Sequence, residues 1–301
     1  MKVSQLGEFG LIDRLTKKFK NGQGTVVGIG DDAAVIQLTT KLLLITTDAL
    51  VQDVHFTLKN TNFADLGYKA LAANVSDIAA MGGRPTAAVI TLALPPGFAV
   101  NKLDDLYRGI NRLAKKLKVD LVGGDTVASP NGMMISITLL GEVVPKNLLR
   151  RSTAKVGDLI CVTGKFGLPA ANKFSARILP PIRLKEAAAL AKANLASAMI
   201  DSSDGLVRSV VELTKASRVG ARLWEERVPI ASGANLDQAL YGGEEYELLF
   251  AVPKARIKSL KKLKFGISVV GEIVNRGAGV KIVDNRGKIK TIRSKGFEHF
   301  K

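Results

Sequence analysis

The chain has 301 residues, and 44 Lys and Arg against 27 Asp and Glu give it a net charge of +17. Its 47% apolar and 24% charged residues are typical of a soluble globular protein, and its length suits about two domains. One cysteine, Cys161, excludes an intramolecular disulfide framework and a multi-cysteine zinc site, and two histidines exclude a three-histidine metal centre.

The first half of the chain alternates between strand and helix patterns. Apolar residues at helical spacing predict helices over 3–19, 62–81 and 102–117. Runs of β-branched and apolar residues predict strands over 25–38, 41–47, 86–94, 119–122 and 133–144. Gly82 and Gly83 stop the second of these helices, and Pro95 and Pro96 end the strand over 86–94 that follows it. These elements make one complete α/β unit.

A polar, basic stretch over 145–157 breaks this pattern, so we expect two domains, 1–145 and 146–301. The second half predicts helices over 184–198, 206–216 and 254–263. It predicts strands over 159–163, 219–223, 247–252 and 267–274, and a hairpin over 280–292. The fold class expected from both halves is α/β (α+β).

The positive charge is concentrated towards the end of the chain, where residues 254–301 hold 14 Lys or Arg against 3 Asp or Glu. Such a surface either binds a polyanion or simply keeps the protein soluble. We favour the second interpretation, because the chain has one Trp, four Tyr and no RNA-binding motif. No apolar run is long enough for a transmembrane helix, and the first 20 residues do not resemble a signal peptide, so a cytoplasmic protein is expected.

Carboxylates follow buried runs or glycine turns at five places in the sequence. They are Asp31 and Asp32, Asp48, Asp77, Asp125, and Asp201 with Asp204. Each one alone is most simply a turn former or a helix N-cap, and Asp204, which precedes Gly205 and an apolar helix, suits an N-cap especially well. Together they predict something else, because converging carboxylates repel one another unless cations lie between them.

Oxygen ligands without His or Cys clusters favour Mg²⁺ over zinc, and Mg²⁺ at such a site commonly serves a nucleotide polyphosphate. Arg150 and Arg151 would then lie near that polyanion. The chain has no P-loop and no complete dinucleotide fingerprint, since the glycines at 28 and 30 lack a third. It also has no serine hydrolase or protein-kinase signature. If ATP binds, it binds through another architecture.

Six motifs occur in a fixed order along the chain. They are GIGDDAAV, TTDALVQDVHF, YKALAANVSDIAAMGGRP, LVGGDT, MIDSSDGL and GGEEYELLF, between an early Gly7–Glu8–Phe9 and a final GFEHF. In this the chain resembles the thiamine-monophosphate kinase family. That family belongs to a superfamily with aminoimidazole ribonucleotide synthetase, selenophosphate synthetase and a hydrogenase-maturation protein.

The resemblance implies a two-domain aminoimidazole ribonucleotide synthetase-like fold. The N-terminal domain would form a β-barrel across a homodimer, with ATP near the dimer interface, and the C-terminal domain would be an α/β sandwich. It implies transfer of a phosphoryl group from ATP to thiamine phosphate, with several Mg²⁺ ions. The implied metal residues are Asp32, Thr46, Thr47, Asp48, Asp77, Asp125, Asp201 and Asp204. The implied ATP residues are Tyr107, Gly124, Asp125, Arg151 and Ser203, and the implied thiamine phosphate residues are His55, Glu244 and Phe297.

This chemistry suits the residue types. The acceptor is a phosphate oxygen that is already ionised, so the reaction needs no general base and no covalent intermediate, and we assign no catalytic side chain. Catalysis is then positioning and electrostatics with in-line transfer, in which Arg151 forks onto phosphate oxygens. Phe297 offers a flat face to the thiamine rings. The simpler alternatives are a hydrophobic plug for Phe297, a structural imidazole for His55 and core packing for Tyr107.

The chain departs from the family pattern on the substrate side. Glu244–Glu245 stands where Glu-Asp is usual, the segment after Gly164 is altered, and the stretch between Trp224 and Gly242 is short. Two other functions were weighed. A sister activity of the superfamily would want a reactive cysteine near the N-terminus or at the C-terminus, and the chain has neither. The other is a non-catalytic basic scaffold that binds RNA or acidic partners.

Overall fold

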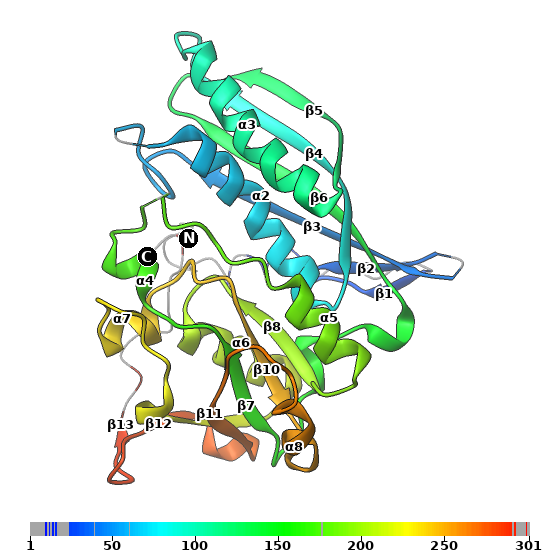
Figure 1. Cartoon of the computed structure of the whole chain (residues 1–301), viewed down its shortest axis with the longest axis vertical. Helices are drawn as coiled ribbons and strands as arrows, with labels where there is room; N and C mark the ends of the chain where they lie inside the picture. Colours follow the sequence, from blue (N-terminus) through cyan, green and yellow to red (C-terminus); the bar gives the residue numbers. More distant parts are fainter. Residues whose placement is uncertain are drawn as a thin grey trace.

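The computed structural model describes residues 10, 12, 14, 16, 24–38, 40–59, 61–175, 177–290, 292 and 299 (Figure 1). Within these ranges the chain forms two separate β-sheets, one from each half of the sequence. Most of the helix predicted over 3–19, and the predicted site residue Phe297, lie outside the described residues. No helix in the described ranges has both the length and the apolar character that crossing a bilayer requires.

The first sheet has six strands in the order β1-β2-β3-β6-β4-β5. Its strands are β1 Thr25–Val27, β2 Ala34–Gln37, β3 Leu42–Val51, β4 Arg84–Leu94, β5 Asp120–Ala128 and β6 Met134–Val143. Only β4 and β5 pair in parallel; the other neighbours are antiparallel. The helices α2 (Phe63–Ala80) and α3 (Val100–Leu117) cover one face of this sheet (Figure 1).

The two helices pack so closely that glycine is required where they touch. Asn62 caps α2 by accepting the backbone N–H of Asp65, and the helix buries Leu66, Leu71 and Ile78 against the sheet. A Cβ on Gly67 would lie 2.0 Å from the backbone oxygen of Leu106 in α3. Both helices are therefore held backbone to backbone, and α2 is fixed in position relative to the sheet.

The second sheet has seven strands in the order β13-β12-β9-β11-β7-β10-β8. They are β7 Leu159–Thr163, β8 Ala198–Ser202, β9 Gly220–Trp224, β10 Glu247–Val252, β11 Ile267–Val274, β12 Val280–Val283 and β13 Ile289–Lys290. Alternate residues of the buried strands face two cores: Phe250 and Cys161 pack with α5 (Leu184–Lys192), and Leu249 and Val162 pack with α6 (Leu206–Ser217). Three short helices complete this half: α4 Leu168–Ala171, α7 Leu236–Tyr241 and α8 Ile257–Leu260.

The mixed α/β character expected from the sequence is confirmed, and most predicted elements are present. The strand predicted over 25–38 was wrong, because the chain turns between β1 and β2 at Gly30, whose φ is +118°. The helix predicted over 184–198 ends at Lys192, because Asn194 takes a left-handed conformation and β8 follows. The helix predicted over 254–263 is a 3₁₀ turn followed by α8, and α4 and α7 were not predicted. The first sheet is open within the described residues, with β1 and β5 at its edges.

The α2–α3 contact can be tested with Gly67→Ala. In an exposed helix this change stabilises by up to about 1 kcal/mol, because alanine is the better helix former. Here the new methyl group meets the Leu106 carbonyl, so we expect a loss of about 2 kcal/mol in the free energy of unfolding. Urea denaturation measures it, with Gly97→Ala as the control, since a Cβ at Gly97 has no atom within 4 Å. Equal effects from the two variants would show that the helices are free to separate.

Candidate functional site

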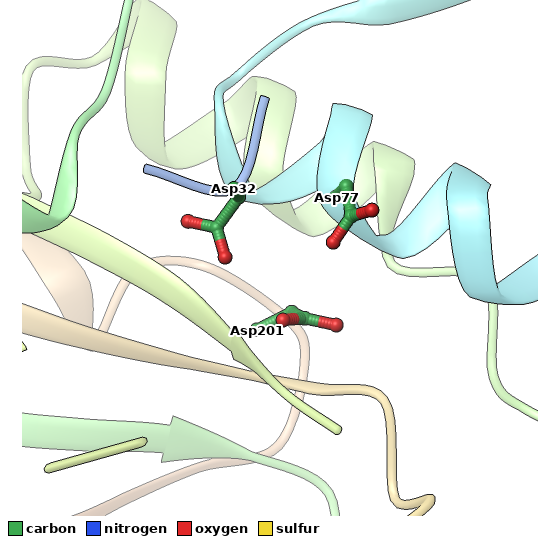
Figure 2. Close-up of side chains that lie close together, drawn as sticks. All are labelled: Asp32, Asp77 and Asp201. Atoms are coloured by element: carbon green, nitrogen blue, oxygen red, sulfur yellow. The ribbon is translucent and has the colours of Figure 1, made fainter. Parts of the chain in front are cut away.

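Three carboxylates meet where the two sheets face each other. Asp32 lies in the turn between β1 and β2, Asp77 on α2 and Asp201 on β8. One carboxylate oxygen from each lies within 4.8 Å of the others, and Figure 2 shows the three side chains pointing towards one another. We call these three residues the acidic cluster. Its members come from both halves of the chain, so the cluster exists only when the halves are packed together.

Neighbouring hydroxyl groups hold two of these carboxylates in place. The Thr46 hydroxyl on β3 donates to Asp77 Oδ2 at 2.5 Å, and the Ser76 hydroxyl on α2 donates to Asp201 Oδ2 at 2.7 Å. Asp48 shares the Thr46 face of β3, because side chains alternate along a strand. The hydroxyl of Thr47 instead donates to the Ile137 carbonyl and accepts from Thr138.

Burial makes this group of carboxylates electrostatically costly. It raises the pKa of Asp48 to about 6 and, helped by the neighbouring charge of Asp32, the pKa of Asp31 to about 7. Burial and then the charges of nearby aspartates raise the pKa values of Asp77 and Asp201 well above the usual range. The Asp32 side chain is 2% exposed, and its Oδ2 has no hydrogen-bond partner among the described residues.

Arg151 supplies part of the missing positive charge. Its Nη2 lies 2.6 Å from Asp32 Oδ1, and its Nε lies 3.4 Å from Asp31 Oδ1. Burial disfavours the charged guanidinium, but the carboxylates of Asp32 and Asp31 outweigh this and raise the pKa of Arg151. The surrounding cavity of about 240 Å³ is lined by seven carboxylates and two arginines. One guanidinium beside the cluster is too little charge, so the cavity suits a divalent cation.

The donor set fits Mg²⁺. The cluster offers carboxylate and hydroxyl oxygens, with no histidine or cysteine among the residues that line the cavity. The unpartnered oxygen of Asp32 is an available ligand atom. Asp204 lines the same cavity, and α6 starts at Leu206 with Gly205 in the cap position and no side-chain cap. The N-cap interpretation of Asp204 is therefore wrong.

A second, larger cavity of about 590 Å³ adjoins the first. The two share Thr47, Asp48, Ser203 and Asp204, and the larger one also contains His55 and Glu244. His55 accepts the Val51 backbone N–H at its Nδ1 at 3.0 Å, and its ring centroid lies 5.1 Å from that of His299. The structure thus brings together all but four of the predicted site residues around two connected cavities.

Glu244 sits on a loop that the fold holds tightly. Its backbone is left-handed with φ of 64°, and its N–H donates to the Ser203 carbonyl at 2.6 Å. A Cβ on Gly205 would lie 2.0 Å from the Gly242 carbonyl oxygen, so the MIDSSDG and GGEEY segments press against each other. The carboxylate of Glu244 pairs with Lys69 of α2, whose Nζ lies 2.5 Å from Oε1.

Three predicted residues lie away from both cavities. Tyr107 is on α3, and Gly124 and Asp125 are on the edge strand β5. Asp125 is exposed and accepts the backbone N–H of Thr126. In the register of the first sheet, Asp125 is aligned through β4 and β6 with Ala49 of β3, the neighbour of Asp48. Three strand spacings separate Asp125 from Ala49, which corresponds to about 14 Å. The fourth, Phe297, is outside the described residues.

Three residues at or beside the larger cavity were not predicted from the sequence: Lys69, Phe174 and Tyr246. Lys69 had a signal, because it lies eight residues before Asp77, close to the two-turn repeat of a helix, in an otherwise apolar stretch. Phe174 lines the larger cavity although its segment was read as a departure from the family pattern. Tyr246 is buried, and burial followed by the charge of Glu244 raises its pKa well above the usual value. Cys161 is buried too, which raises its pKa to about 12 and leaves an inert thiol.

The chain matches two protein-family models. One is "AIR synthase related protein, N-terminal domain" over residues 30–143, and the other is "AIR synthase related protein, C-terminal domain" over residues 155–284. It is also similar to curated thiamine-monophosphate kinases. That of Buchnera aphidicola subsp. Schizaphis graminum is 35% identical over 97% of this chain and 99% of its own length. That of Bacillus subtilis (strain 168) is 32% identical over 98% of this chain and all of its own length.

A solved structure described as "AaThiL complexed with AMPPCP and TMP" has a similar fold. Its TM-score is 0.87 at 31% identity, with 99% of both chains covered.

Replacing Asp201 by Asn tests the repulsion in the acidic cluster. A folded-state pKa above the unfolded value of 3.8 means that the unfolded chain loses its proton first as pH rises. For Asp31 and Asp48 the resulting destabilisation develops between pH 3.8 and about 7. We therefore expect the wild type in EDTA to lose thermal stability over this range. At pH 7.5 in EDTA, we expect Asp201→Asn to melt at least about 2 °C above the wild type.

Addition of Mg²⁺ should then raise the melting temperature of the wild type much more than that of Asp201→Asn. Asp105→Asn on α3 is the matched control, because this half-exposed carboxylate pairs with Arg108 and lines neither cavity. An equal fall in the melting temperature of Asp201→Asn, relative to the wild type, in EDTA and in Mg²⁺ would show that the carboxylates of the acidic cluster do not repel one another.

Proposed function

The chain belongs to the AIR synthase related proteins and, within them, to the thiamine-monophosphate kinases, and from this premise we propose that it transfers the γ-phosphoryl group of ATP to thiamine phosphate. The products are ADP and thiamine diphosphate. Membership rests on full-length relatives at 32–35% identity and on family models that match both halves. The related structure with AMPPCP and TMP supports these two substrates.

One observation about the geometry carries the proposal. A cavity lined by seven carboxylates adjoins a larger cavity, lined by His55 and Glu244, with which it shares four lining residues. Such an arrangement suits a reaction between two phosphates, because cations in the first cavity can receive the phosphate groups while the second receives the organic part of the acceptor. Thr47, Asp48, Ser203 and Asp204 lie where the two meet.

Asp32, Asp77 and Asp201 would hold Mg²⁺, and Asp48 lies close enough to the cluster to contribute to its field. Bound Mg²⁺ neutralises phosphate charge and so allows two polyanions to approach. The proposed metal set further includes Thr46, Thr47 and Asp204, and also Asp125, which lies on β5 outside both cavities and would hold a separate ion. Thr46 and Ser76 orient the carboxylates of Asp77 and Asp201 through hydroxyl hydrogen bonds.

The remaining residues would position the two substrates. Arg151 carries a guanidinium that can turn from Asp32 to the phosphates of ATP, with Ser203 beside it and Tyr107, Gly124 and Asp125 farther along the ATP molecule. His55, Glu244 and Phe297 would contact thiamine phosphate. The attacking phosphate oxygen is already ionised, so the side chains have no proton to remove, and the rate comes from alignment and charge compensation.

Each of the two proposed domains contains one of the two sheets. We place the boundary near residue 145, with 1–145 as the domain for ATP, Mg²⁺ and dimerisation, and 146–301 as the second α/β domain. The family models, which end at 143 and resume at 155, support this division.

A homodimer is part of the proposal. The edge strand β5 is exposed along almost its whole length and carries Val122 and Val127, which are 62% and 46% exposed. An apolar, unpaired sheet edge is a surface that a second copy can cover, and joining two such sheets would give the expected barrel. Because Gly124 and Asp125 lie on this strand, ATP would bind close to the interface.

Asp48→Asn tests the metal assignment. The variant keeps the shape of the side chain but loses a charge at the junction of the cavities. We expect turnover of thiamine phosphate to fall by at least about 100-fold, since even outer-sphere changes at metal sites cost 10- to 100-fold. The assay follows thiamine diphosphate formed from ATP, Mg²⁺ and thiamine phosphate by the purified protein. Asp105→Asn should match the wild type, and normal activity of Asp48→Asn at limiting Mg²⁺ would remove Asp48 from the metal site.

Val122→Lys tests the dimer. A lysine at this edge position charges the surface that the second subunit would cover, so the variant is expected to elute as a monomer in size-exclusion chromatography with light scattering. Val100→Lys is the matched control, because Val100 is 71% exposed at the start of α3 and lies off the sheet edge. The interface lies elsewhere if Val122→Lys remains dimeric at the same concentration as the control.

A further inference from the structure

Lys69 is a charged residue in the interior of the molecule that the proposed reaction does not use. It lies on α2 and is 1% exposed, among apolar residues such as Ala70 and Leu71. Its Nζ lies 2.5 Å from Glu244 Oε1, on a loop 175 residues away in the sequence. A buried ammonium group is costly unless a partner compensates for it, so an apolar residue would be the simpler occupant of this position.

The partner of Lys69 is fixed at its backbone as well. Glu244 has a left-handed backbone, which is uncommon for a residue with a side chain, and its N–H donates to Ser203. Its carboxylate lines the larger cavity and is 19% exposed. Lys69 holds one oxygen of the carboxylate, and the backbone of Glu244 is fixed as well. These two constraints together limit the directions that the other oxygen can take.

Electrostatics explains why such an anchor is needed. Glu244 shares the larger cavity with Asp48 and Asp204, and its charge acts on the buried Tyr246 beside it. Without a nearby cation, the carboxylate would be pushed away from these like charges. Lys69 on α2 is not among the residues that line this cavity, and its ion pair with Glu244 supplies the compensating charge.

The position of Lys69 along α2 indicates which end of the acceptor, the phosphate or the ring system, would lie beside Glu244. Lys69, Ala73 and Asp77 are four residues apart, so they lie near one face of the helix, and Ala73 lines the larger cavity. Eight residues correspond to about 12 Å along the helix axis. One end of this face therefore reaches the acidic cluster, where the phosphate would lie, and the other reaches Glu244, where the ring system would lie.

We propose that Lys69 is a positioning residue for acceptor recognition, which fixes the Glu244 carboxylate so that it binds the cationic or amino-bearing ring end of the phosphate acceptor. This rests on the proposed function, which supplies the acceptor. A carboxylate held in one direction pairs with a ring cation or an amino group and makes no such contact with the uncharged alkyl group of an alkyl phosphate. Lys69 thereby contributes to selection of the acceptor without contacting it.

The experiment measures steady-state kinetics of Lys69→Met, Glu244→Gln and the double variant in the full-length protein. Lys69→Met keeps the length of the side chain and removes the charge. We expect the KM for thiamine phosphate to rise about tenfold or more, the scale of a lost hydrogen bond to a charged group. The KM for ATP and kcat should stay within about twofold, the pattern of lost ground-state binding. Lys185→Met, on the exposed side of α5, is the control.

The double variant separates positioning from general stabilisation. If Lys69 acts through Glu244, Lys69→Met adds nothing to the KM of Glu244→Gln, whereas independent roles multiply. An unchanged KM in Lys69→Met, or multiplication in the double variant, overturns the proposal even if the melting temperature falls. If Lys69→Met does not fold, Lys69→Arg decides: the moved charge should raise the KM for thiamine phosphate alone, and an unchanged value overturns the idea. Failure of the proposed function is distinguishable, because the wild type itself would then form no thiamine diphosphate.

Discussion

The structure depends on an unfavourable interaction, the repulsion between carboxylates buried where the two sheets meet. Asp32, Asp77 and Asp201 come from a turn, a helix and a strand, and each would be harmless alone. The fold brings one oxygen of each within 4.8 Å of the others, and of the described residues only two arginines, Arg151 and Arg208, line the cavity with seven carboxylates. Such a deficit of positive charge supports the proposed cation site, because a ligand that binds only the folded state and relieves the repulsion would stabilise that state.

The helix α2 turns this local deficit into a site with two ends. Its contact with α3 at Gly67 fixes its position on the first sheet, and its C-terminal part packs against α5 of the other half. Along the face towards the second half it presents Lys69, then Ala73, then Ser76 and Asp77. One rigid element thus sets both the distance and the relative direction of the acidic cluster and of Glu244. Alignment of two substrates by a single helix suits a reaction whose rate comes from positioning.

Much of this was visible in the sequence, for physical reasons that also explain what was not. The acids stood out because each interrupts a buried or glycine-rich pattern, as Asp48 does after the apolar start of β3. Long elements with one clear period, such as α3 and β6, were predicted within a few residues. The errors lie where a local conformation decides, as at Gly30 or Asn194, which end a periodic run by taking a positive φ. Lys69 stands out locally as a charge in a largely apolar helix, but its partner could not be predicted, because no local pattern connects it with Glu244, 175 positions away.

Two of the departures from the family pattern, Glu245 and the segment after Gly164, are in contact in the structure. Glu245, one methylene longer than the usual Asp, is buried and accepts the backbone N–H of Gly167 at 3.1 Å. Gly167 belongs to the altered segment after Gly164, so the two departures touch each other and are matched. Glu245 does not line the larger cavity, whereas its neighbour Glu244 does. The longer side chain therefore supports the loop through Gly167, while the Lys69–Glu244 pair is a separate contact on the other residue of this acidic pair.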